Sequence, residues 1–406
     1  MGDRPLLFAL VACVCYLLAF STSHAFVHWA LPEKLRVGLG SQARNIALDG
    51  IRGYLAFSVY LHHCLLTWFF LPGGRWISPA HNFEYQLGAT SVAIFFMITA
   101  FLFWGRAQAR AGLEVKQFLI SRLFRIYPLY LFVLFLICLG VAYKSNWTAV
   151  ESARNIASEV VKWLFFRTPD INSYERTTLI VKGVTWTLLY EAWFYISLPL
   201  LVLVFLKRNR IWKKVIAVGI VALLFYFNRL NISIAATFLG GVVAVYWRMD
   251  KKRMDVARTH AAAGVAILCL GSVIMLMYKP FNPVGIALLT IFFAVIASGN
   301  TLFGFLEMRG ALWLGEVSYS IYLCHGIILW VFMQNILPRL HFFHYTTKWF
   351  VASAIGITPI VVILSSASYL LIERPLINIG HRLSKRRVVL VKAKLEGTAA
   401  DVVQAG

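Results

Sequence analysis

The stretch LDGIRGYLAFSVYLHHCLL, residues 48–66, is an apolar segment interrupted by charged and titratable side chains. Asp49 and Arg52 stand at its start, and His62 and His63 stand near its middle. The apolar run around it is long enough for a helix to cross a bilayer core of roughly 30 Å. Titratable groups inside such a helix are costly and usually face a cavity, so this stretch predicts both a membrane span and a candidate functional site.

The rest of the chain has the same apolar character. It contains 406 residues, of which 60% are hydrophobic and 14% charged, and its mean hydropathy is +0.73. Soluble proteins are about half apolar and a quarter charged. Unbroken runs of Leu, Val, Phe and Ala favour helices over barrel strands, which would alternate. We therefore expect an all-α fold, a polytopic transmembrane helix bundle. The spans, about eleven, are predicted over residues 6–30, 51–71, 87–105, 119–142, 184–206, 211–228, 231–248, 261–278, 284–299, 312–334 and 349–372.

The basic residues are distributed unequally between the two ends of these helices. One side holds 27 of the 39 Lys and Arg residues, and the positive-inside rule makes that side cytoplasmic. An odd number of spans then places the N-terminus outside and the C-terminus inside. The loop of about 143–183 is expected outside, and the loops 207–214 and 251–258 are expected in the cytoplasm.

The net charge of +22 is explained without nucleic acid. Topology determinants and contacts with anionic lipid headgroups account for it, so membrane lipids are expected partners and nucleic acid is not. The first apolar run could be a signal peptide over residues 1–25. Because its apolar character continues through Phe26 to Leu31 without an A-x-A cleavage site, we favour an uncleaved span.

Helical geometry separates the two neighbouring histidines. Arg52 and His63 are eleven residues apart, which is three turns plus about 20°, so they share a face roughly 16 Å apart along the axis. His62 points about 100° away and is expected to pack against a neighbouring helix or to donate to a backbone oxygen. Asp49 is expected to pair with Arg52 and to cap the helix start. The simpler alternative is an interfacial Arg and a His that is satisfied by a backbone carbonyl.

Further polar groups stand in the predicted spans. Arg122 and Arg125 begin one span at its cytoplasmic end, where they could also be topology signals. Glu191 lies among aromatic residues about two turns inside the outer end of its span, a position that is costly unless the carboxyl is paired or protonated. His325 lies in mid-span, shortly after Tyr319.

At the end of the last span, Glu373 and Arg374 precede Pro375. The stronger interpretation here is a local ion pair at the interface, followed by a proline that stops the helix.

Six segments in series resemble the membrane-bound acyltransferase 3 family. The resemblance covers roughly residues 46–376. Its most specific element is an Arg followed by ten residues and a His, matched here by Arg52 and His63. The segments are LDGIRGYLAFSVYLHH, IFFMITAFLF, SRLFRIYPLYLF, WTLLYEAWFYISLPLL, SYSIYLCHG and IERP. Because the family core has ten spans, the resemblance implies an extra N-terminal helix and basic loop over 1–45, an acyltransferase domain over 46–376 and a basic cytoplasmic tail over 377–406.

The sequence departs from the family pattern at several positions. Thr99 and Ala100 replace the usual Ser-Gly, and Ala192 replaces the second acid of the Trp-Ser-Leu-x-x-Glu-Glu type motif. Ser121 stands where a further Arg is common, and His62 duplicates the histidine. None of these changes removes the Arg52–His63 pair.

The resemblance implies an integral membrane O-acyltransferase of the bacterial inner (cell) membrane. Such an enzyme moves an acyl group from cytoplasmic acyl-CoA, commonly acetyl-CoA, to a hydroxyl of a saccharide or lipid-linked envelope glycan. No tightly bound cofactor is expected. Arg52, Arg122 and Arg125 would bind the phosphates of coenzyme A, because the planar guanidinium fork suits phosphate. His63 would act as general base, or through a transient acyl-His.

The remaining candidates have supporting roles in this interpretation. Glu191 would orient the acceptor or a second proton-transfer group, and Asp49 would hold Arg52. His325, Tyr319 and Glu373 are possible support residues. No metal site is expected, because the histidines lie on different predicted helices without a partner acid at ligand spacing.

Two other classes of function fit the same polar groups. A transporter or flippase for an anionic or lipid-linked sugar would also need a positive vestibule and intramembrane Glu and His residues. A membrane scaffold would contain them only as buried hydrogen-bonded pairs. The ordered series of segments favours the enzyme.

Overall fold

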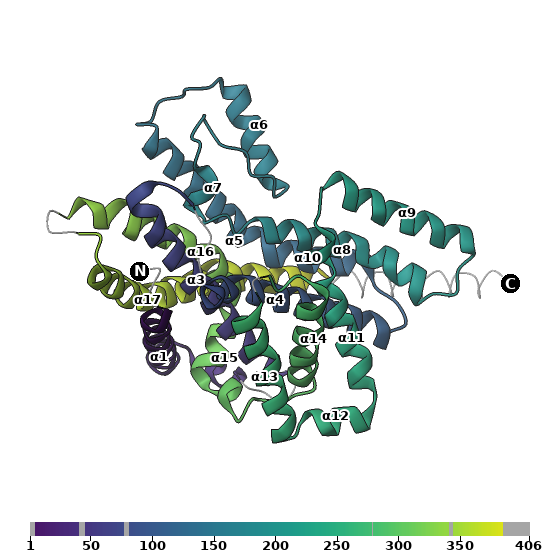
Figure 1. The fold of residues 1–406 in the computed structure, drawn as a ribbon. Coiled ribbons are helices and arrows are strands. Elements are labelled where there is room, and N and C mark those ends of the chain that lie inside the picture. The colour runs from purple at the N-terminus through teal and green to yellow at the C-terminus, as the bar shows by residue number, and fades with distance from the viewer. Residues whose placement is uncertain (1–4, 40–44, 77–80, 278, 341–343, 385–406) are drawn as a thin grey trace.

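The fold of the chain is given by a computed structural model, which describes residues 5–39, 45–76, 81–277, 279–340 and 344–384. Within these ranges every regular element is a helix (Figure 1). The expected all-α helix bundle is therefore confirmed. Most of the expected C-terminal tail, residues 385–406, lies outside the described residues.

The helices fall into long and short elements (Figure 1). The longer ones are α1 (Pro5–Trp29), α3 (Ile46–Gly73), α4 (Asn82–Ala109), α5 (Val115–Lys144), α8 (Trp186–Phe205), α9 (Ile211–Phe227), α13 (His260–Leu276), α14 (Pro283–Ala297) and α17 (Thr347–Ser368). The shorter ones are α2 (Glu33–Gly38), α6 (Ala153–Leu164), α7 (Thr177–Ile180), α10 (Ile232–Ala235), α11 (Thr237–Met249), α12 (Lys251–Ala257), α15 (Arg309–Glu316) and α16 (Ser318–Leu329).

Eight helices in the described ranges are long and apolar enough to cross a membrane, against the eleven spans expected from the sequence. A ninth span is present if α12 and α13, which meet at a bend of 75°, are counted as one. The other two expected spans are α9 and α14, which have only 17 and 15 residues. A helix of 15 residues is about 22 Å long, so α14 is shorter than a bilayer core.

The centre of the bundle is formed by α3, which packs against α4, α15 and α16. The N-terminal helix α1 covers this centre from one side, where it packs on α15 and α17 (Figure 1). Ser23 of α1 donates a hydrogen bond to the backbone oxygen of Gly310 at 3.0 Å, and the rings of Phe8 and Phe350 lie 6.2 Å apart. The first helix is therefore an integral part of the packing.

Helices α16 and α17 each continue directly into a π turn. These turns are Trp330–Ile336 after α16 and Tyr369–Glu373 after α17. After the second π turn the helix continues to Ser384, so the expected stop at Pro375 is wrong. A π turn accommodates a residue without a backbone N–H because the local hydrogen-bond ladder is already interrupted.

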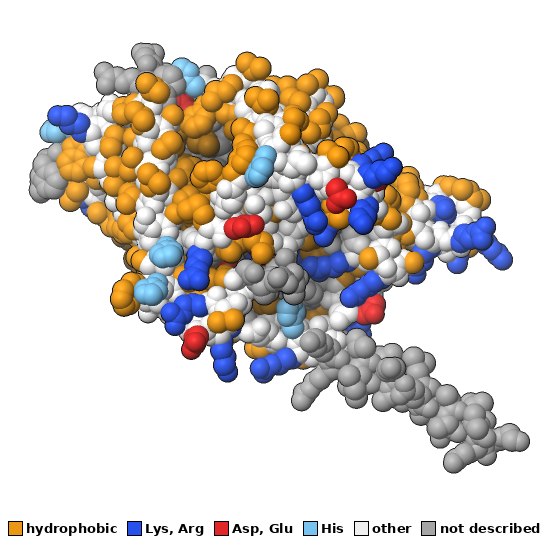
Figure 2. Space-filling model, turned by 90° about the horizontal axis from the view of Figure 1, so that it is seen from below, with side chains coloured by type: hydrophobic (Ala, Val, Ile, Leu, Met, Phe, Trp, Pro, Cys, Tyr) orange, Lys and Arg blue, Asp and Glu red, His pale blue; other side chains and the backbone are white. Residues whose placement is uncertain are grey.

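The outside of the bundle is strongly apolar. Large hydrophobic side chains are exposed on several long helices, among them Phe135, Leu223, Leu268 and Leu371. Figure 2 shows hydrophobic side chains over much of one face, whereas Lys and Arg side chains gather toward one part of it. Such a surface would be unstable in water and is suited to lipid. The chain is a multi-pass integral membrane protein.

Candidate active site

Helix α3 carries the Arg52–His63 pair on one continuous element. Its cap is Asn45, whose side chain accepts a hydrogen bond from the backbone N–H of Leu48. The expectation that Asp49 caps this helix is therefore wrong. Asp49 lies in the first turn instead and interacts electrostatically with Arg52, as expected from their spacing.

Helix α15 packs closely against α3 beside Arg52. A side chain at Gly315 would place its Cβ 1.8 Å from the backbone oxygen of Asp49, so only glycine allows this contact. The next residue, Glu316, is thereby brought into the electrostatic field of Arg52. The guanidinium of Arg52 therefore lies in the field of three acidic groups, Asp49, Glu316 and Glu373, and of the neighbouring cation Arg125.

The imidazoles of His63 and His325 form a hydrogen-bonded pair. Nδ1 of His63 lies 3.0 Å from Nε2 of His325, and Nδ1 of His325 lies 2.8 Å from the backbone oxygen of Ile321. A carbonyl oxygen only accepts, so Nδ1 of His325 carries a proton, and in a neutral ring its Nε2 then accepts. His63 must donate through Nδ1. Its Nε2 is left with a free lone pair, which is the form that a general base requires.

His62 has a different environment. Its Nδ1 lies 2.8 Å from the backbone oxygen of Glu84, and its ring packs where a side chain at Gly88 would otherwise stand. His62 was expected to pack against a neighbouring helix or to donate to a backbone oxygen, and both contacts are present.

A cavity of about 280 Å³ lies on the Arg52 side of the histidine pair. We call it the arginine cavity, because four arginines line it together with Glu191, Glu316, Tyr319 and a group of aromatic and aliphatic side chains. Along α4 its lining runs from Val92 to Arg106, a distance of about 21 Å. The arginines are Arg52, Arg106, Arg122 and Arg125. The cavity is therefore long, basic at one end and apolar at the other.

Arg122 forms no ion pair within the described part of the chain, although it interacts electrostatically with Glu191. Its guanidinium lies 4.6 Å from the centre of the Phe103 ring and donates to the hydroxyl of Ser121 at 3.1 Å. Its Nε is buried without a hydrogen-bond partner. A buried donor on a cation is costly unless it is paired, so this group is suited to an anionic ligand in the cavity.

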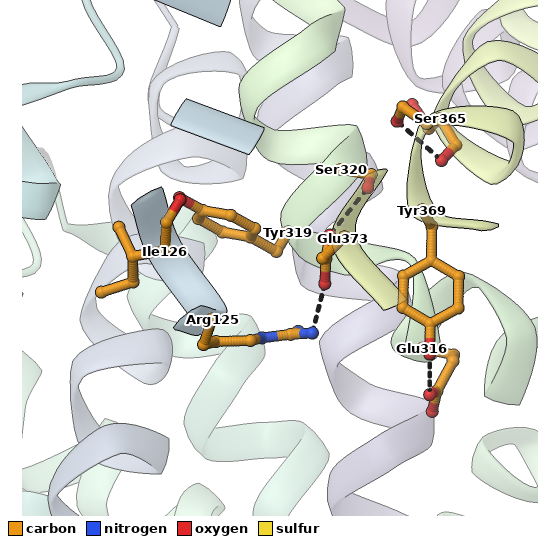
Figure 3. A network of polar contacts seen from close by, with 9 residues as sticks. Arg125, Ile126, Glu316, Tyr319, Ser320, Ser365, Tyr369 and Glu373 are labelled. Carbon is orange, nitrogen blue, oxygen red and sulfur yellow. Dashed lines mark hydrogen bonds and ion pairs between the residues drawn. The ribbon is translucent and has the colours of Figure 1, made fainter. Parts of the chain in front are cut away.

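Arg125 is held by the protein itself. It forms an ion pair with Glu373, which is fully buried and also accepts a hydrogen bond from Ser320 at 2.8 Å (Figure 3). The interpretation of Glu373 as the partner of its neighbour Arg374 at the interface is therefore wrong. Tyr319 lies beside this pair and donates to the backbone oxygen of Ile126 at 2.8 Å (Figure 3).

A second hydrogen bond of this region joins the hydroxyl of Tyr369 to the carboxyl of Glu316 (Figure 3). Tyr369 belongs to the same π turn as Glu373. The π turn of the last described helix is therefore tied to α15 by Tyr369 and to α5 by Glu373.

Glu191 faces the arginine cavity. Its carboxyl accepts hydrogen bonds from Thr99 and Tyr195, both at 3.3 Å, and it lies in the field of Arg122. Thr99 thus fills the place of the usual serine with another hydroxyl donor. The structure places Glu191 with the arginines that were expected to bind the donor.

A second cavity, of about 300 Å³, lies on the other side of the histidine pair. Two cations line it, Lys144 at the end of α5 and Arg176 just before α7, and we call it the Lys144–Arg176 cavity. Four aromatic side chains also line it: Phe70, Tyr174, Trp330 and Tyr345.

Helix α3 shows that the histidine lies between the two cavities. Arg52 lines the arginine cavity and Phe70 lines the Lys144–Arg176 cavity. His63 lies eleven residues after Arg52 and seven residues before Phe70, and all three share one helix face. The axial separations are about 16 Å and about 10 Å.

The same order occurs on α16 and the π turn that follows it. Tyr322 lines the arginine cavity, and its ring lies 6.2 Å from that of His325. Trp330, five residues beyond His325, lines the Lys144–Arg176 cavity. Two helices therefore independently place the histidine pair between a basic cavity and a second, aromatic one.

Lys182 is a further candidate that the sequence analysis did not single out. It is only 3% exposed, its Nζ has no hydrogen-bond partner, and it lies 5.8 Å from the ring of Trp76, which itself stacks on His63. Burial lowers the pKa of Lys182 to about 7. Its left-handed backbone, with φ of 56°, is unusual for lysine. The adjacent glycine, Gly183, was the only sequence signal for this turn.

The loop that carries Lys182 reaches the histidines through a second glycine contact. A Cβ at Gly326, next to His325, would lie 2.6 Å from the backbone of Val181. Glycine at this position lets the loop pack directly on α16. Lys182 and His325 consequently interact electrostatically.

In the described part of the chain, no group of three or more His, Cys, Asp or Glu side chains is placed to hold a metal ion. The groups present are suited to a polyanion at the arginine cavity and to proton transfer at His63. These features define a membrane protein with two cavities and a hydrogen-bonded histidine pair between them.

A family model described as an acyltransferase domain matches residues 45–367, about four-fifths of the chain. The chain belongs to the acyltransferase 3 family and is a membrane acyltransferase. Neither the curated proteins nor the solved structures compared with it include a match. Family membership decides in favour of the enzyme over the transporter and scaffold interpretations.

Proposed function

We propose that the protein transfers an acyl group, commonly acetyl, from cytoplasmic acyl-CoA to a hydroxyl of a saccharide or envelope glycan. The observation that carries this proposal is the position of the His63–His325 pair between the two cavities. The distribution of basic residues supports a cytoplasmic position for the Arg52 end of the bundle.

In this proposal the donor occupies the arginine cavity. The phosphates of coenzyme A bind at its basic end, where Arg122 presents a buried nitrogen without a partner. The pantetheine arm follows the apolar walls toward Tyr322 and brings the thioester near the histidine pair. The cavity length of about 21 Å along α4 supports this arrangement, because an extended arm of roughly 15–20 Å would fit within it.

His63 then serves as the general base. As the acceptor oxygen attacks the thioester carbonyl, Nε2 of His63 takes the hydroxyl proton, and a carbon–oxygen bond forms. The carbon–sulfur bond breaks, and the proton passes to the departing thiolate of coenzyme A. His325 keeps the ring of His63 in the required tautomer through the hydrogen bond at 3.0 Å. His325 is therefore a positioning residue.

Glu191 supports the donor side of this scheme. Its hydrogen bonds to Thr99 and Tyr195 fix a carboxyl opposite Arg122 inside the cavity. Such a group can hold the guanidinium in place before the donor binds. We therefore assign Glu191 to positioning within the donor site and not to acceptor orientation.

Purified protein in liposomes tests the proposal. Acetyl-CoA labelled in its acetyl group is supplied with envelope glycans, and transfer is measured as base-labile label in the glycan, together with release of free coenzyme A. The expected result is acceptor-dependent transfer that is lost in His63→Ala. Thiol release without any acylated acceptor, across glycan and lipid fractions, would contradict transfer to a hydroxyl acceptor.

A further inference from the structure

Two exposed cations, Lys144 and Arg176, line the Lys144–Arg176 cavity. Lys144 and Arg176 come from different segments, and neither forms an ion pair within the described residues. The neighbouring cation Arg339 adds to the positive potential at Lys144. Like charges that are brought together without a counter-ion repel each other, so the arrangement is suited to an anionic ligand.

The walls around these cations are flat and aromatic. Nζ of Lys144 lies 5.7 Å from the ring of Trp330, and the guanidinium of Arg176 lies 5.4 Å from the ring of Phe70. Aromatic faces are electron-rich and attract the weakly positive C–H groups of a sugar ring as well as cations. A lipid tail or a simple ion would not need this combination of rings and polar groups.

A third, independent feature indicates a missing ligand. Nε2 of Gln334 is buried in the lining of this cavity and has no hydrogen-bond partner. Buried amide donors are nearly always paired, so this group is available to an acceptor that enters the cavity. The cavity volume of about 300 Å³ is at the lower end of the range for small-molecule sites, about 300–1,000 Å³.

We propose that this cavity is the acceptor site and that it selects a saccharide carrying an anionic group, either a carboxylate or a phosphate. The inference rests on the proposed function, because it takes the hydroxyl of that saccharide as the group acylated at His63. Lys144 and Arg176 bind the anionic group, Trp330 and Phe70 bind the ring faces, and Gln334 donates to a ring oxygen or hydroxyl. The reacting hydroxyl lies toward His63, about 10 Å from Phe70 along α3.

Direct binding measurements test this selectivity without relying on turnover. Methyl glucuronide, glucose 1-phosphate and methyl glucoside are titrated against the full-length protein in detergent, followed by saturation-transfer NMR. At least one anionic probe is expected to bind about 10–100-fold more tightly than methyl glucoside, the range given by hydrogen bonds to charged groups. The two anionic probes distinguish carboxylate from phosphate as the preferred group. Equal or tighter binding of methyl glucoside would overturn the proposal.

Variants that remove the cations of the cavity test whether Lys144 and Arg176 cause the preference for anionic probes. The double variant Lys144→Gln/Arg176→Gln is expected to bind all three probes with similar affinity. Lys162→Gln removes an exposed cation on α6 and is the matched control, which should keep the wild-type preference. If the double variant does not fold, each single substitution should reduce the preference on its own. An undiminished preference in folded variants would contradict the assignment.

Failure of the anionic acceptor site can be distinguished from failure of the proposed acyl transfer reaction. Acyl transfer that proceeds equally well to neutral and anionic glycans, with no change in the charge variants, would overturn the anionic site and leave the acyl transfer reaction intact. Selective anion binding without any acyl transfer would leave the site standing and contradict the proposed function.

Discussion

Substitution of Arg122 by Gln is expected to weaken acyl-CoA binding while leaving the bundle stable. In the absence of donor, Arg122 lies over the rings of Phe103 and Tyr195, donates to the hydroxyl of Ser121 and lies in the field of Glu191, and its buried Nε is unpaired. None of these contacts is an ion pair within the described residues, so less native interaction is lost than at Arg125. A hydrogen bond to a charged group is worth about 1.5–3 kcal/mol, so loss of one phosphate contact should raise the KM for acyl-CoA by about 10–150-fold with a small change in kcat.

Arg125→Gln is the matched comparison, one helical turn away on α5. Its partner Glu373 is fully buried and would keep only the hydrogen bond from Ser320. Breaking a buried ion pair by removing one partner costs about 3–5 kcal/mol, so this variant should unfold at a lower temperature. Initial rates over a range of acyl-CoA concentrations and thermal unfolding in the same detergent measure both effects.

The sequence predicted that both Arg122 and Arg125 bind the phosphates of the donor. The two variants test that prediction for each arginine separately. The reasoning would be refuted if Arg122→Gln lost as much stability as Arg125→Gln while keeping its donor KM. It would also be refuted if Arg125→Gln raised the KM without any loss of stability.

The histidine pair and the buried lysine give further predictions. His325→Gln should retain more activity than His325→Asn in transfer assays. Only the longer amide places an acceptor oxygen where Nε2 of His325 accepts the hydrogen bond from Nδ1 of His63. Equal rates would contradict the assigned tautomer. The free energy of unfolding should rise with pH between about 7 and the ordinary lysine value of 10.5, because the unfolded chain there binds the proton that buried Lys182 releases. Lys182→Met should flatten this rise in thermal unfolding measured across that pH range, and an unchanged slope would show that Lys182 is not its source. Single cysteines in the segment 251–258, which the sequence predicted as a cytoplasmic loop and which contains α12, should not react with an impermeant reagent in intact cells, and their labelling would reverse the proposed orientation.

Local sequence pattern was sufficient for the features that lie within one helix. The apolar runs predicted the long helices, and the spacing of Arg52 and His63 predicted their shared face. The angle of 100° between neighbours also separated His62 from His63. These inferences succeed because helix geometry is fixed by the backbone and needs no knowledge of the tertiary fold.

The ends of the helices were harder to predict. Asn45 caps α3 although Asp49 is an equally good capping residue by type, because Asn45 has the extended backbone that a cap requires and Asp49 is already helical. Pro375 does not stop the last helix, because the π turn before it removes the conflict. Span counting from hydropathy also gave no sign of the bend between α12 and α13.

Pairings between distant segments could not be predicted from the sequence. His63 and His325 are 262 residues apart, and Arg125 and Glu373 are 248 residues apart. Their contacts depend on how helices pack, which a single sequence does not specify. Lys182 was overlooked for the same reason, because a lysine in a loop resembles a topology signal until its burial is known.

The central claim is that His63, with its Nε2 lone pair, is the base of the acyl transfer. The most direct measurement compares acetyl transfer by His63→Ala and His62→Ala in liposomes that contain equal amounts of folded protein, with acetyl-CoA binding determined separately. His63→Ala is expected to lose about 10²–10⁴-fold in kcat while it still binds the donor, because a general base contributes that much. His62→Ala should keep most of its turnover, since Nδ1 of His62 is engaged by the backbone oxygen of Glu84 and its ring packs against Gly88, Tyr85 and His63. Full activity in His63→Ala, or a loss confined to His62→Ala, would contradict the account.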